Sequence, residues 1–358
     1  MIALNSAIKT IIDDRTCRAK LAIVVLSILL LFSMWFSLVV GAYDVSIKNF
    51  IQSLLSSYHH ETTFTRDYLV IMNIRLPRLV LGVMVGAALS VSGVLMQGLF
   101  RNPLADPGIM GISSGAGLGA VSMIVLGGSM PSISLLLGKF HIAIGAFIGA
   151  LITTFILYAI ATRQGRTSIA TMLLAGITLS ALCASALGIL VFMANDHQLR
   201  DITFWNLGSL AGTTWSRVWL CCPFILAGLL FSPFLTRAMN AFSLGEAVAG
   251  HLGFSVQRTK YFVILLVALM CGAAVAVSGI IGFIGIVIPH ILRLTIGPDH
   301  RYLIIGSALL GASILILADT FSRFIVAPAE LPIGIVTSLL GAPFFLWILL
   351  RQRGAIDQ

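Results

Sequence analysis

The side chains of this chain that could do chemistry are few and widely spaced. Asp, Glu, Lys and Arg make up only 10% of its 358 residues. No nucleophile, base and acid stand out as a catalytic set. The only Gly-Lys pair, Gly138-Lys139, is followed by Phe140, so the phosphate-binding run Gly-x-x-x-x-Gly-Lys-Ser/Thr is missing. We therefore expect neither an enzyme nor an ATP-binding subunit.

Metal and cofactor chemistry is not indicated either. His290 has no second histidine or carboxylate at a matching offset, and His59 and His60 lie in a polar loop, where we expect surface residues. Four of the five cysteines lie in apolar runs, and none has the spacing of a metal or redox motif. These cysteines are Cys17, Cys183, Cys221, Cys222 and Cys271. We expect no metal site and no cofactor.

Three arginines could instead recognise an acidic partner. Arg75 and Arg78 flank Leu76-Pro77, and Arg323 follows Asp319 by four residues, so those two side chains can meet on one helix face. Arginines at the ends of membrane helices often reach toward the interface with water, which is one interpretation. The other is an outward-facing basic patch that docks an acidic protein.

The elements that position these residues are membrane helices. The chain is 58% hydrophobic, with a mean hydropathy of +1.04. A spanning helix needs about 20 mostly apolar residues, and the runs here are continuously apolar rather than alternating as in a barrel. The sequence predicts an all-α bundle of ten transmembrane helices. The runs are 21–42, 79–100, 108–129, 141–161, 168–194, 213–236, 261–280, 281–296, 303–320 and 333–350.

The basic residues predict how these spans are oriented. If the N-terminus is cytoplasmic, most of the 22 lysines and arginines fall on the cytoplasmic side, as the positive-inside rule requires. We expect a cytoplasmic segment over 1–20, a single transmembrane domain over 21–350 and a cytoplasmic tail over 351–358. The net charge of +9 then reflects topology rather than a nucleic-acid surface, because the basic residues are scattered among loops.

Small residues predict close contacts between the spans. Glycines four residues apart let helix backbones approach one another in lipid. The run from Ser278 to Gly285 predicts a tight reversal between spans seven and eight, and Pro289 is expected to interrupt span eight. The glycine pairs are Gly82/Gly86, Gly115/Gly119 and Gly145/Gly149.

The longest polar segment on the cytoplasmic side is 237–260. Ser243 and Glu246 have the spacing of a capping box, so we expect a short helix that Gly250 or Gly253 ends. Leu244, Val248 and Leu252 would share one face of it. Such a helix can dock into a groove of a partner or lie on the lipid surface, and its place between two spans favours the partner.

Taken in order, these motifs resemble the permease subunits of iron-siderophore, haem and vitamin B12 ABC importers. The resemblance covers about Arg75 to Leu350 and rests on long, ordered motifs. They are Arg75-Leu-Pro-Arg78, Gln97, Arg101-Asn-Pro-Leu-Ala-Asp-Pro-Gly108, Gly111-Ile-Ser-Ser-Gly-Ala-Gly117, Leu244-Gly-Glu-Ala with Leu252-Gly253, Gly279-Ile-Ile-Gly-Phe-Ile-Gly285, Pro289-His290, Asp299-His-Arg301 and Ala329-Glu-Leu-Pro-Ile-Gly334.

The resemblance implies a homodimer in the bacterial inner membrane, with both termini cytoplasmic and the translocation path between the two copies. It implies two cytoplasmic ATP-binding subunits and a periplasmic substrate-binding protein. The docking residues for the binding protein would be Arg75, Arg78 and Arg323. The coupling loop to the ATPase would use Leu244, Gly245, Glu246, Ala247, Gly250, Leu252 and Gly253, and the structural motif would be Asn102, Pro103, Asp106, Pro107 and Gly108.

Haem is the expected cargo, with a ferric siderophore or vitamin B12 as the alternative. The segments Phe204 to Leu210, Gly297 to Arg301 and Val326 to Pro332 look most like those of the haem importers. Apolar and weakly polar walls, from spans five and eight, would suffice for such a cargo. An ion-coupled secondary transporter would need buried ionisable groups and inverted repeats. A membrane-embedded enzyme would need a polar catalytic cluster, and the sequence shows none of these clearly.

Overall fold

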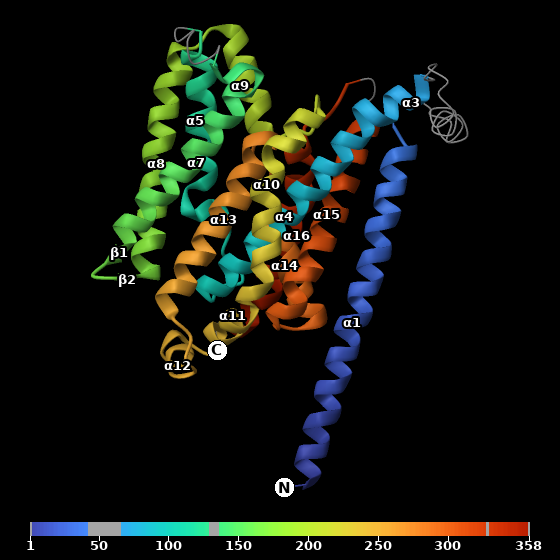
Figure 1. The fold of residues 1–358 in the computed structure, drawn as a ribbon, viewed down its shortest axis with the longest axis vertical. Helices are drawn as coiled ribbons and strands as arrows, with labels where there is room; N and C mark the ends of the chain where they lie inside the picture. The colour runs from blue at the N-terminus through green and yellow to red at the C-terminus, as the bar shows by residue number, and fades with distance from the viewer. Residues whose placement is uncertain (1, 42–65, 129–135, 327–328, 357–358) are drawn as a thin grey trace.

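The computed structural model describes residues 2–41, 66–128, 136–326 and 329–356, and helices dominate it (Figure 1). His59 and His60 lie outside the described residues. Among the described residues, seven helical stretches are long and apolar enough to cross a membrane, and three shorter apolar helices cover Ile112–Leu126, Ile284–Ile296 and Ile333–Trp347. These ten helices coincide with the ten predicted spans, so the predicted architecture is confirmed.

The described residues form helices and one small hairpin. The elements are α1 Ile2–Val39, α3 Arg66–Val70, the π-helix η1 Ile71–Arg75, α4 Leu76–Phe100, η2 Pro107–Met110, α5 Ile112–Leu126, η3 Gly138–Phe140, α7 His141–Ala161, β1 Thr162–Arg163, β2 Arg166–Thr167, α8 Ile169–Met193, α9 Asp196–Leu207, α10 Trp215–Phe231, η4 Ser232–Leu235, α11 Thr236–Ser243, α12 Glu246–His251, α13 Val256–Ser278, α14 Ile284–Ile296, α15 His300–Ile325 and α16 Ile333–Ile356. The strands pair antiparallel, with Thr162 opposite Thr167.

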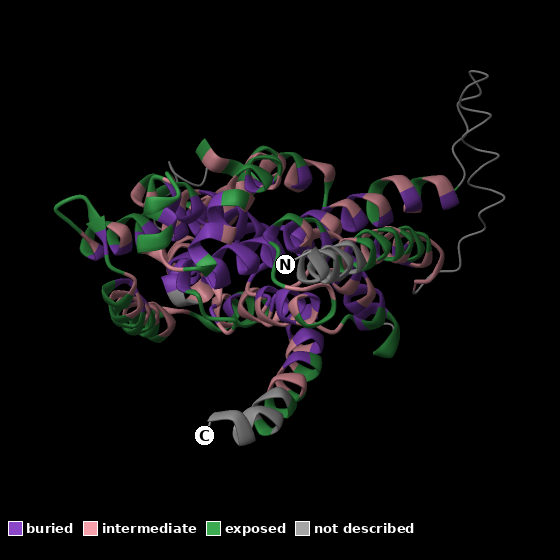
Figure 2. Cartoon of the chain, turned by 90° about the horizontal axis from the view of Figure 1, so that it is seen from below, coloured by how far each residue is buried: buried purple, intermediate pink, exposed green. Residues whose placement is uncertain are grey.

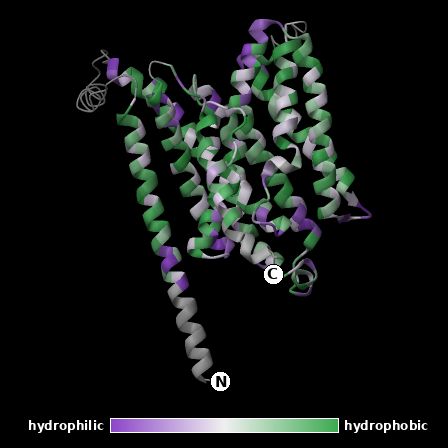
Figure 3. Cartoon of the chain, turned by 180° about the vertical axis from the view of Figure 1, so that it is seen from behind, coloured by the Kyte–Doolittle hydropathy of each residue, from purple (hydrophilic) through white to green (hydrophobic). Residues whose placement is uncertain are grey.

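Helix α4 crosses the middle of the bundle, and α10, α13, α14 and α15 pack against it. Helix α1 stands at the periphery and packs on α15. Burial is concentrated around α4, while much of the described part of α1 and Leu346, Trp347 and Leu350 of α16 are exposed (Figure 2). The spans are mostly hydrophobic and the hydrophilic residues gather at the two ends (Figure 3). This is the distribution that a bilayer selects.

The two ends of the bundle differ in what they carry. Both chain ends, α12 and the β1–β2 hairpin lie at one end, which we call the inner end (Figure 1). Helices α3 and α9 lie at the opposite, outer end. A helix of 25 residues such as α4 is roughly 38 Å long, because each residue adds about 1.5 Å. Helices α4 and α15 therefore reach from one end to the other.

Glycine brings α4 and α15 into backbone contact. A Cβ atom on Gly86 would lie 2.4 Å from the carbonyl oxygen of Gly311, and one on Gly311 would lie 1.7 Å from the Ser90 hydroxyl. Only glycine allows this separation, since real Cβ atoms do not approach other atoms so closely. The contact gives two long helices a shared seam in a medium where apolar burial alone does not hold helices together.

The predicted glycine pairs of spans three and four form a second seam. A Cβ atom on Gly119 would lie 2.1 Å from the Gly145 carbonyl oxygen, and one on Gly149 would lie 2.2 Å from the Gly115 carbonyl oxygen. Helices α5 and α7 therefore pack along both pairs, as the four-residue spacing predicts. Gly82 differs, because a Cβ atom there would meet the side chain of Leu210 at 3.3 Å rather than a helix backbone.

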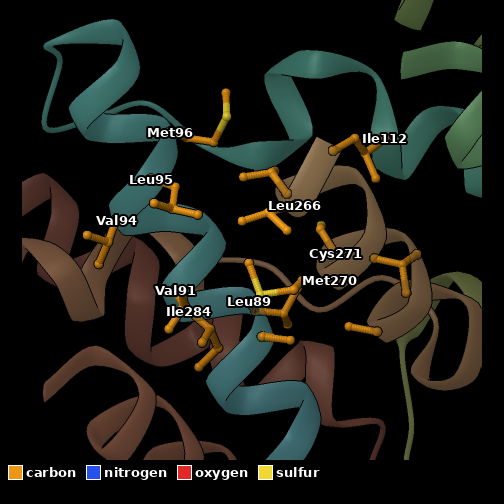
Figure 4. Packing of buried hydrophobic residues seen from close by; sticks show 14 of the residues in the cluster. Leu89, Val91, Val94, Leu95, Met96, Ile112, Leu266, Met270, Cys271 and Ile284 are labelled. Carbon is orange, nitrogen blue, oxygen red and sulfur yellow. The ribbon is translucent and has the colours of Figure 1, made fainter. Parts of the chain in front are cut away.

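The apolar core surrounds the second half of α4. Figure 4 shows Leu89, Val91, Val94, Leu95 and Met96 of this helix among buried residues of its neighbours. The neighbours supply Ile112 from α5, Ile284 from α14, and Leu266, Met270 and Cys271 from α13. Three of the four cysteines in the spans, Cys183, Cys221 and Cys271, are buried, in keeping with small apolar residues.

The reversal between spans seven and eight lies where the glycines predict it. Helix α13 ends at Ser278, Gly279 has φ +70°, and a Cβ atom on Gly279 would lie 2.2 Å from the Trp205 carbonyl oxygen. The expected interruption at Pro289 is wrong, because α14 continues through it. Proline has no N–H for the Gly285 carbonyl four residues earlier. The side-chain amide of Gln97 donates to that carbonyl at 3.4 Å and to Ile286 O at 3.2 Å.

Candidate functional site

The three predicted docking arginines come together at the outer end. A Cβ atom on Gly41 would lie 2.8 Å from Arg75 Nη2 and 3.5 Å from Arg323 Nη1. Arg78 and Arg323 share a partner in Asp319. All three arginines are buried, with 5%, 7% and 8% of the residue exposed for Arg75, Arg78 and Arg323. The expectation of a solvent-exposed patch is therefore wrong, and the reason is that the chain itself supplies their partners.

Two of these arginines cap the last turn of α1. The Arg75 guanidinium donates to the carbonyl oxygens of Leu38 and Val39, the latter at 2.9 Å. Arg323 Nη2 donates to the Ser37 hydroxyl at 2.9 Å and lies 3.4 Å from the Ser37 carbonyl. The last carbonyls of a helix have no partner within the helix and carry partial negative charge. The two arginines donate hydrogen bonds to these carbonyls and place positive charge beside them, and they fix the end of α1 against η1 and α15.

Arg78 is held between two carboxylates. Its Nε and Nη2 atoms donate to Asp319 at 2.9–3.0 Å, and its Nη1 atom donates to both Glu330 oxygens at 3.0 and 2.9 Å. The predicted pair between Asp319 and Arg323 is present at 3.4 Å, but Arg78 is the closer partner of Asp319. The fork of the guanidinium suits two carboxylates at once. The sequence offers no spacing that would reveal this contact across 241 residues.

The segment 237–260 lies at the inner end and folds as two short helices, α11 and α12. The predicted capping role of Ser243 is wrong. Ser243 is the last residue of α11 and donates to the Asn240 carbonyl at 2.6 Å, while Gly245 precedes α12 with φ +116°. The chain turns between the two helices at a conformation that only glycine adopts readily, so the side-chain cap has no place there.

The end of α12 follows the predicted glycine. Gly253 has φ +87°, its N–H donates to Gly250 O at 3.0 Å, and the Phe254 N–H donates to Ala249 O at 3.1 Å. This pair of hydrogen bonds is the Schellman arrangement, which satisfies the last carbonyls of a helix. Three apolar side chains are left exposed around α12, with exposed fractions of 66%, 42% and 58% for Leu244, Val248 and Leu252.

A buried lysine attaches α12 to the rest of the inner end. Lys260 Nζ lies 2.7 Å from Glu246 Oε2 and donates to the Thr167 carbonyl at 2.7 Å. The Thr167 N–H in turn donates to Gln257 Oε1 at 2.9 Å. The lysine is 2% exposed, so its charge needs both acceptors. Helix α12, the β1–β2 hairpin and the start of α13 are thereby joined through Lys260.

Helix α11 is fixed to the first turn of α15 by Asn240. Its side-chain oxygen accepts from the His300 N–H at 2.9 Å and lies 2.8 Å from His300 Nδ1, and its amide donates to Asp299 Oδ1 at 2.7 Å. Asp299 also caps α15 by accepting from the Arg301 N–H. Sequence reasoning noted Asp299 and His300 only as a motif. Asn240 itself carried no signal, since a lone asparagine in a polar loop is ordinary.

The segment 101–111 returns the chain from α4 to α5 through two side-chain turns. Asn102 Oδ1 accepts from the Leu104 N–H at 2.9 Å, and Asp106 Oδ1 accepts from the Gly108 N–H at 2.6 Å. Pro103 lies in the turn, and Pro107 begins η2, where its missing N–H costs nothing. Removal from water raises the pKa of the Asp106 carboxyl, which the Gly108 N–H opposes. These roles explain the residue types of the motif.

A shallow groove of about 560 Å³ opens beside α16. Asn206 and Leu207 of α9, Ile280 and Gly282 of the reversal, and Ser338 of α16 contribute to it. Its wall is apolar with few polar groups. Backbones meet closely behind it, because a Cβ atom on Gly334 would lie 2.2 Å from the Leu207 carbonyl oxygen.

The chain is similar in sequence and in fold to known transport proteins. A profile of the FecCD transport family matches residues 29–351. The "Hemin transport system permease protein HmuU" of Yersinia pestis is 49% identical over 282 residues, which cover 79% of this chain and 83% of that protein. The "Vitamin B12 import system permease protein BtuC" of Shigella boydii is 40% identical over 329 residues, covering 92% and 94%. A solved metal-chelate type ABC transporter in an inward-facing conformation is similar with a TM-score of 0.80 at 29% identity, covering 92% of this chain and 98% of that one.

Proposed function

The chain belongs to the FecCD transport family and is a permease subunit of an ABC importer, and on this premise we propose that it imports haem across the bacterial inner membrane. The observation that carries the choice of cargo is the 49% identity with a hemin permease. A ferric siderophore or vitamin B12 is the alternative, because a vitamin B12 permease is 40% identical over more of the chain.

The energy would come from two ATP-binding subunits bound at the inner end. The segment 237–260 supports this proposal, because Leu244, Val248 and Leu252 are exposed on and beside α12 at that end, while Lys260 pairs with Glu246 in the first turn of α12. An exposed apolar face on a fixed short helix suits a groove in a partner protein. In this proposal Leu244, Gly245, Glu246, Ala247, Gly250, Leu252 and Gly253 form the coupling loop, and the inner end faces the cytoplasm with both termini.

The outer end would receive a periplasmic substrate-binding protein. The clustering of Arg75, Arg78 and Arg323 supports this role, since arginines pair with the carboxylates of an acidic partner and steer its approach. The three side chains are already paired within the chain. Docking therefore requires the partner to replace some of those contacts, and the partly exposed Glu330 marks where access is easiest, with 42% of its side chain exposed.

The structure offers a physical route between the two ends. Helix α15 begins at the Asn240 contact with α11 and carries Asp319 and Arg323 near its other end, and α4 lies along it through Gly86 and Gly311. Close-packed protein interiors have low compressibility and transmit strain. We propose that displacement of α11 and α12 by the ATPase moves α4 and α15 together.

Two copies of the chain would enclose the cargo path. The groove beside α16 and the exposed apolar residues of that helix, such as Leu339 and Leu340, support a second copy covering this face. A wall with few polar groups would let a large planar cargo leave again, because tight binding slows release. Alternating access would then open the path to each side of the membrane in turn.

Uptake into proteoliposomes tests the cargo. The chain would be reconstituted with its cognate ATPase, with ATP on the ATPase side and the binding protein loaded with labelled haem, a ferric siderophore or vitamin B12. We expect haem to accumulate at least about tenfold faster than the other two, a difference that about 1.4 kcal/mol of selectivity provides. Faster entry of the siderophore or of vitamin B12 would contradict haem as the cargo and leave the importer class intact.

A further inference from the structure

The two carboxylates that hold Arg78 are unequal in their access to water. Asp319 has 4% of its side chain exposed, and Glu330 has 42%. Asp319 meets the Nε and Nη2 edge of the guanidinium, and Glu330 alone meets Nη1 with both oxygens. One edge of Arg78 is therefore committed to the interior, and the other is bound to a group that water and solutes can reach.

This difference determines which contact can be exchanged. Removing Asp319 from Arg78 would leave a buried charge without its partner, and Asp319 also contacts Arg323 at 3.4 Å. Glu330 lies on a segment outside the helices, between α15 and α16, and its ion pair is screened by the solvent around it. A carboxylate arriving from outside would therefore meet Glu330 first and would need to match only one edge of the guanidinium.

We propose that Glu330 is a built-in competitor for the docking surface, and that a carboxylate of the substrate-binding protein takes its place on Arg78 Nη1. This inference rests on the proposed function, because it assumes that the outer end docks such a protein. Glu330 keeps the arginine paired while no binding protein is present. The same contact lowers the affinity of docking, since each docking event must break it, and so favours release after delivery.

If Glu330 competes with the binding protein for Arg78, removal of the Glu330 charge should strengthen docking rather than weaken it. The variant Glu330→Gln keeps the shape of the side chain and removes its charge, so it should strengthen docking, whereas Arg78→Gln should weaken it. Removal of a partly exposed competitor should lower the dissociation constant about two- to fivefold, the range expected for exposed ion pairs. Arg78→Gln should raise that constant about tenfold or more. A conservative Glu330→Asp variant, with a shorter reach, should fall between the parent chain and Glu330→Gln.

The experiment measures binding of the substrate-binding protein to the full chain in nanodiscs with its ATPase, at low salt and at physiological salt. Asp196→Asn is the matched control, because Asp196 is an exposed acid on α9 at the same end and, within the described part of the chain, forms no ion pair with the three arginines. Thermal unfolding of each variant shows whether it is folded. Tighter binding by Glu330→Gln beyond the control supports the exchange, with the larger gain at low salt, where exposed charges act most strongly.

The possible failures are distinguishable. If Arg78→Gln weakens docking while a folded Glu330→Gln and Glu330→Asp bind no tighter than the control, the competitor role is wrong and the docking surface stands. If every folded variant, including Arg78→Gln, binds as the parent chain does, the outer arginines do not dock the binding protein. If Glu330→Gln weakens docking, Glu330 is itself a contact for the partner and the exchange is overturned.

Discussion

The ammonium group of Lys260 lies 2.7 Å from the carboxylate of Glu246, and this ion pair joins α12 to the first turns of α13. The pair is asymmetric, because the lysine side chain is 2% exposed and that of Glu246 is 34% exposed. The buried partner anchors the exposed helix. A short helix of six residues could not keep a defined position by itself. In the proposed coupling role, this contact would hold α12 in place against the rest of the inner end.

Breaking this pair should loosen α12 without unfolding the bundle. We expect Glu246→Gln to lower the free energy of unfolding by about 1–2 kcal/mol, since Lys260 keeps the Thr167 carbonyl as an acceptor. Transport should fall several-fold while the amount of chain in the membrane is unchanged. The double variant Glu246→Gln/Lys260→Met should lose less stability than the two single variants added together, because no buried charge is then left unpaired. Strictly additive losses in thermal stability would contradict the pairing.

Gly253 offers a test of backbone geometry alone. Its φ is +87°, and a Cβ atom there would meet no atom within 4 Å, so Gly253→Ala adds strain without a clash. The left-handed conformation costs about 1–2 kcal/mol for residues other than glycine. We expect the end of α12 to rearrange, uptake to fall and membrane insertion to persist. Gly212→Ala is the control, because Gly212 lies outside this segment, has φ +62°, and an added Cβ atom there would meet no atom within 4 Å. Equal uptake by both variants would count against a coupling role for this segment.

The seam between α4 and α15 should be intolerant of any side chain. Gly311→Val would place a Cβ atom 2.6 Å from the Gly86 carbonyl oxygen. We expect a loss of stability of about 3 kcal/mol or more, because neither helix backbone can move without disturbing the core. Size-exclusion profiles and thermal unfolding of the purified chain measure this. Gly188→Ala on α8 should leave both unchanged, since no atom lies within 4 Å of its added Cβ. Normal folding of Gly311→Val would show that the seam is looser than described.

Asp319 should be more important for folding than any exposed acid. Asp319→Asn leaves Arg78 and Arg323 without their buried carboxylate, and breaking a buried pair costs about 3–5 kcal/mol. Glu330 remains on Arg78, so we expect the lower part of this range. Asp201→Asn is the control, because among the described residues the exposed Asp201 forms an ion pair only with the exposed His197, at 3.2 Å, and the change should alter stability by less than about 0.5 kcal/mol. Similar melting temperatures for the two variants would contradict the buried network.

Much of the fold could be predicted because membrane helices leave direct signals in the sequence. Continuous apolar runs marked ten spans, and Gly115, Gly119, Gly145 and Gly149 marked a seam that the structure confirms. The reversal after Ser278 was marked by its glycines. These features depend on local composition and spacing, and both can be seen in one amino-acid sequence.

The features that could not be predicted depend on pairing between distant segments. The burial of Arg75 and Arg323 follows from the position of the last turn of α1, and the sequence gives no sign of where that helix ends in space. Likewise, α14 passes through Pro289 because Gln97, 188 residues away from Gly285, donates to the freed carbonyl. The error at Ser243 has a local cause, since the turn at Gly245 replaces a side-chain cap.

The measurement that tests the central claim most directly is haem uptake into proteoliposomes with and without the ATPase subunit. The permease would be present in equal amounts in both preparations, with ATP on the ATPase side and haem-loaded binding protein on the other. We predict uptake that requires both the ATPase and ATP, that stops when ATP is replaced by a non-hydrolysable analogue, and that falls in the Gly253→Ala variant. Equal uptake in vesicles that lack the ATPase would contradict the account, because the chain would then move its cargo without a coupled partner.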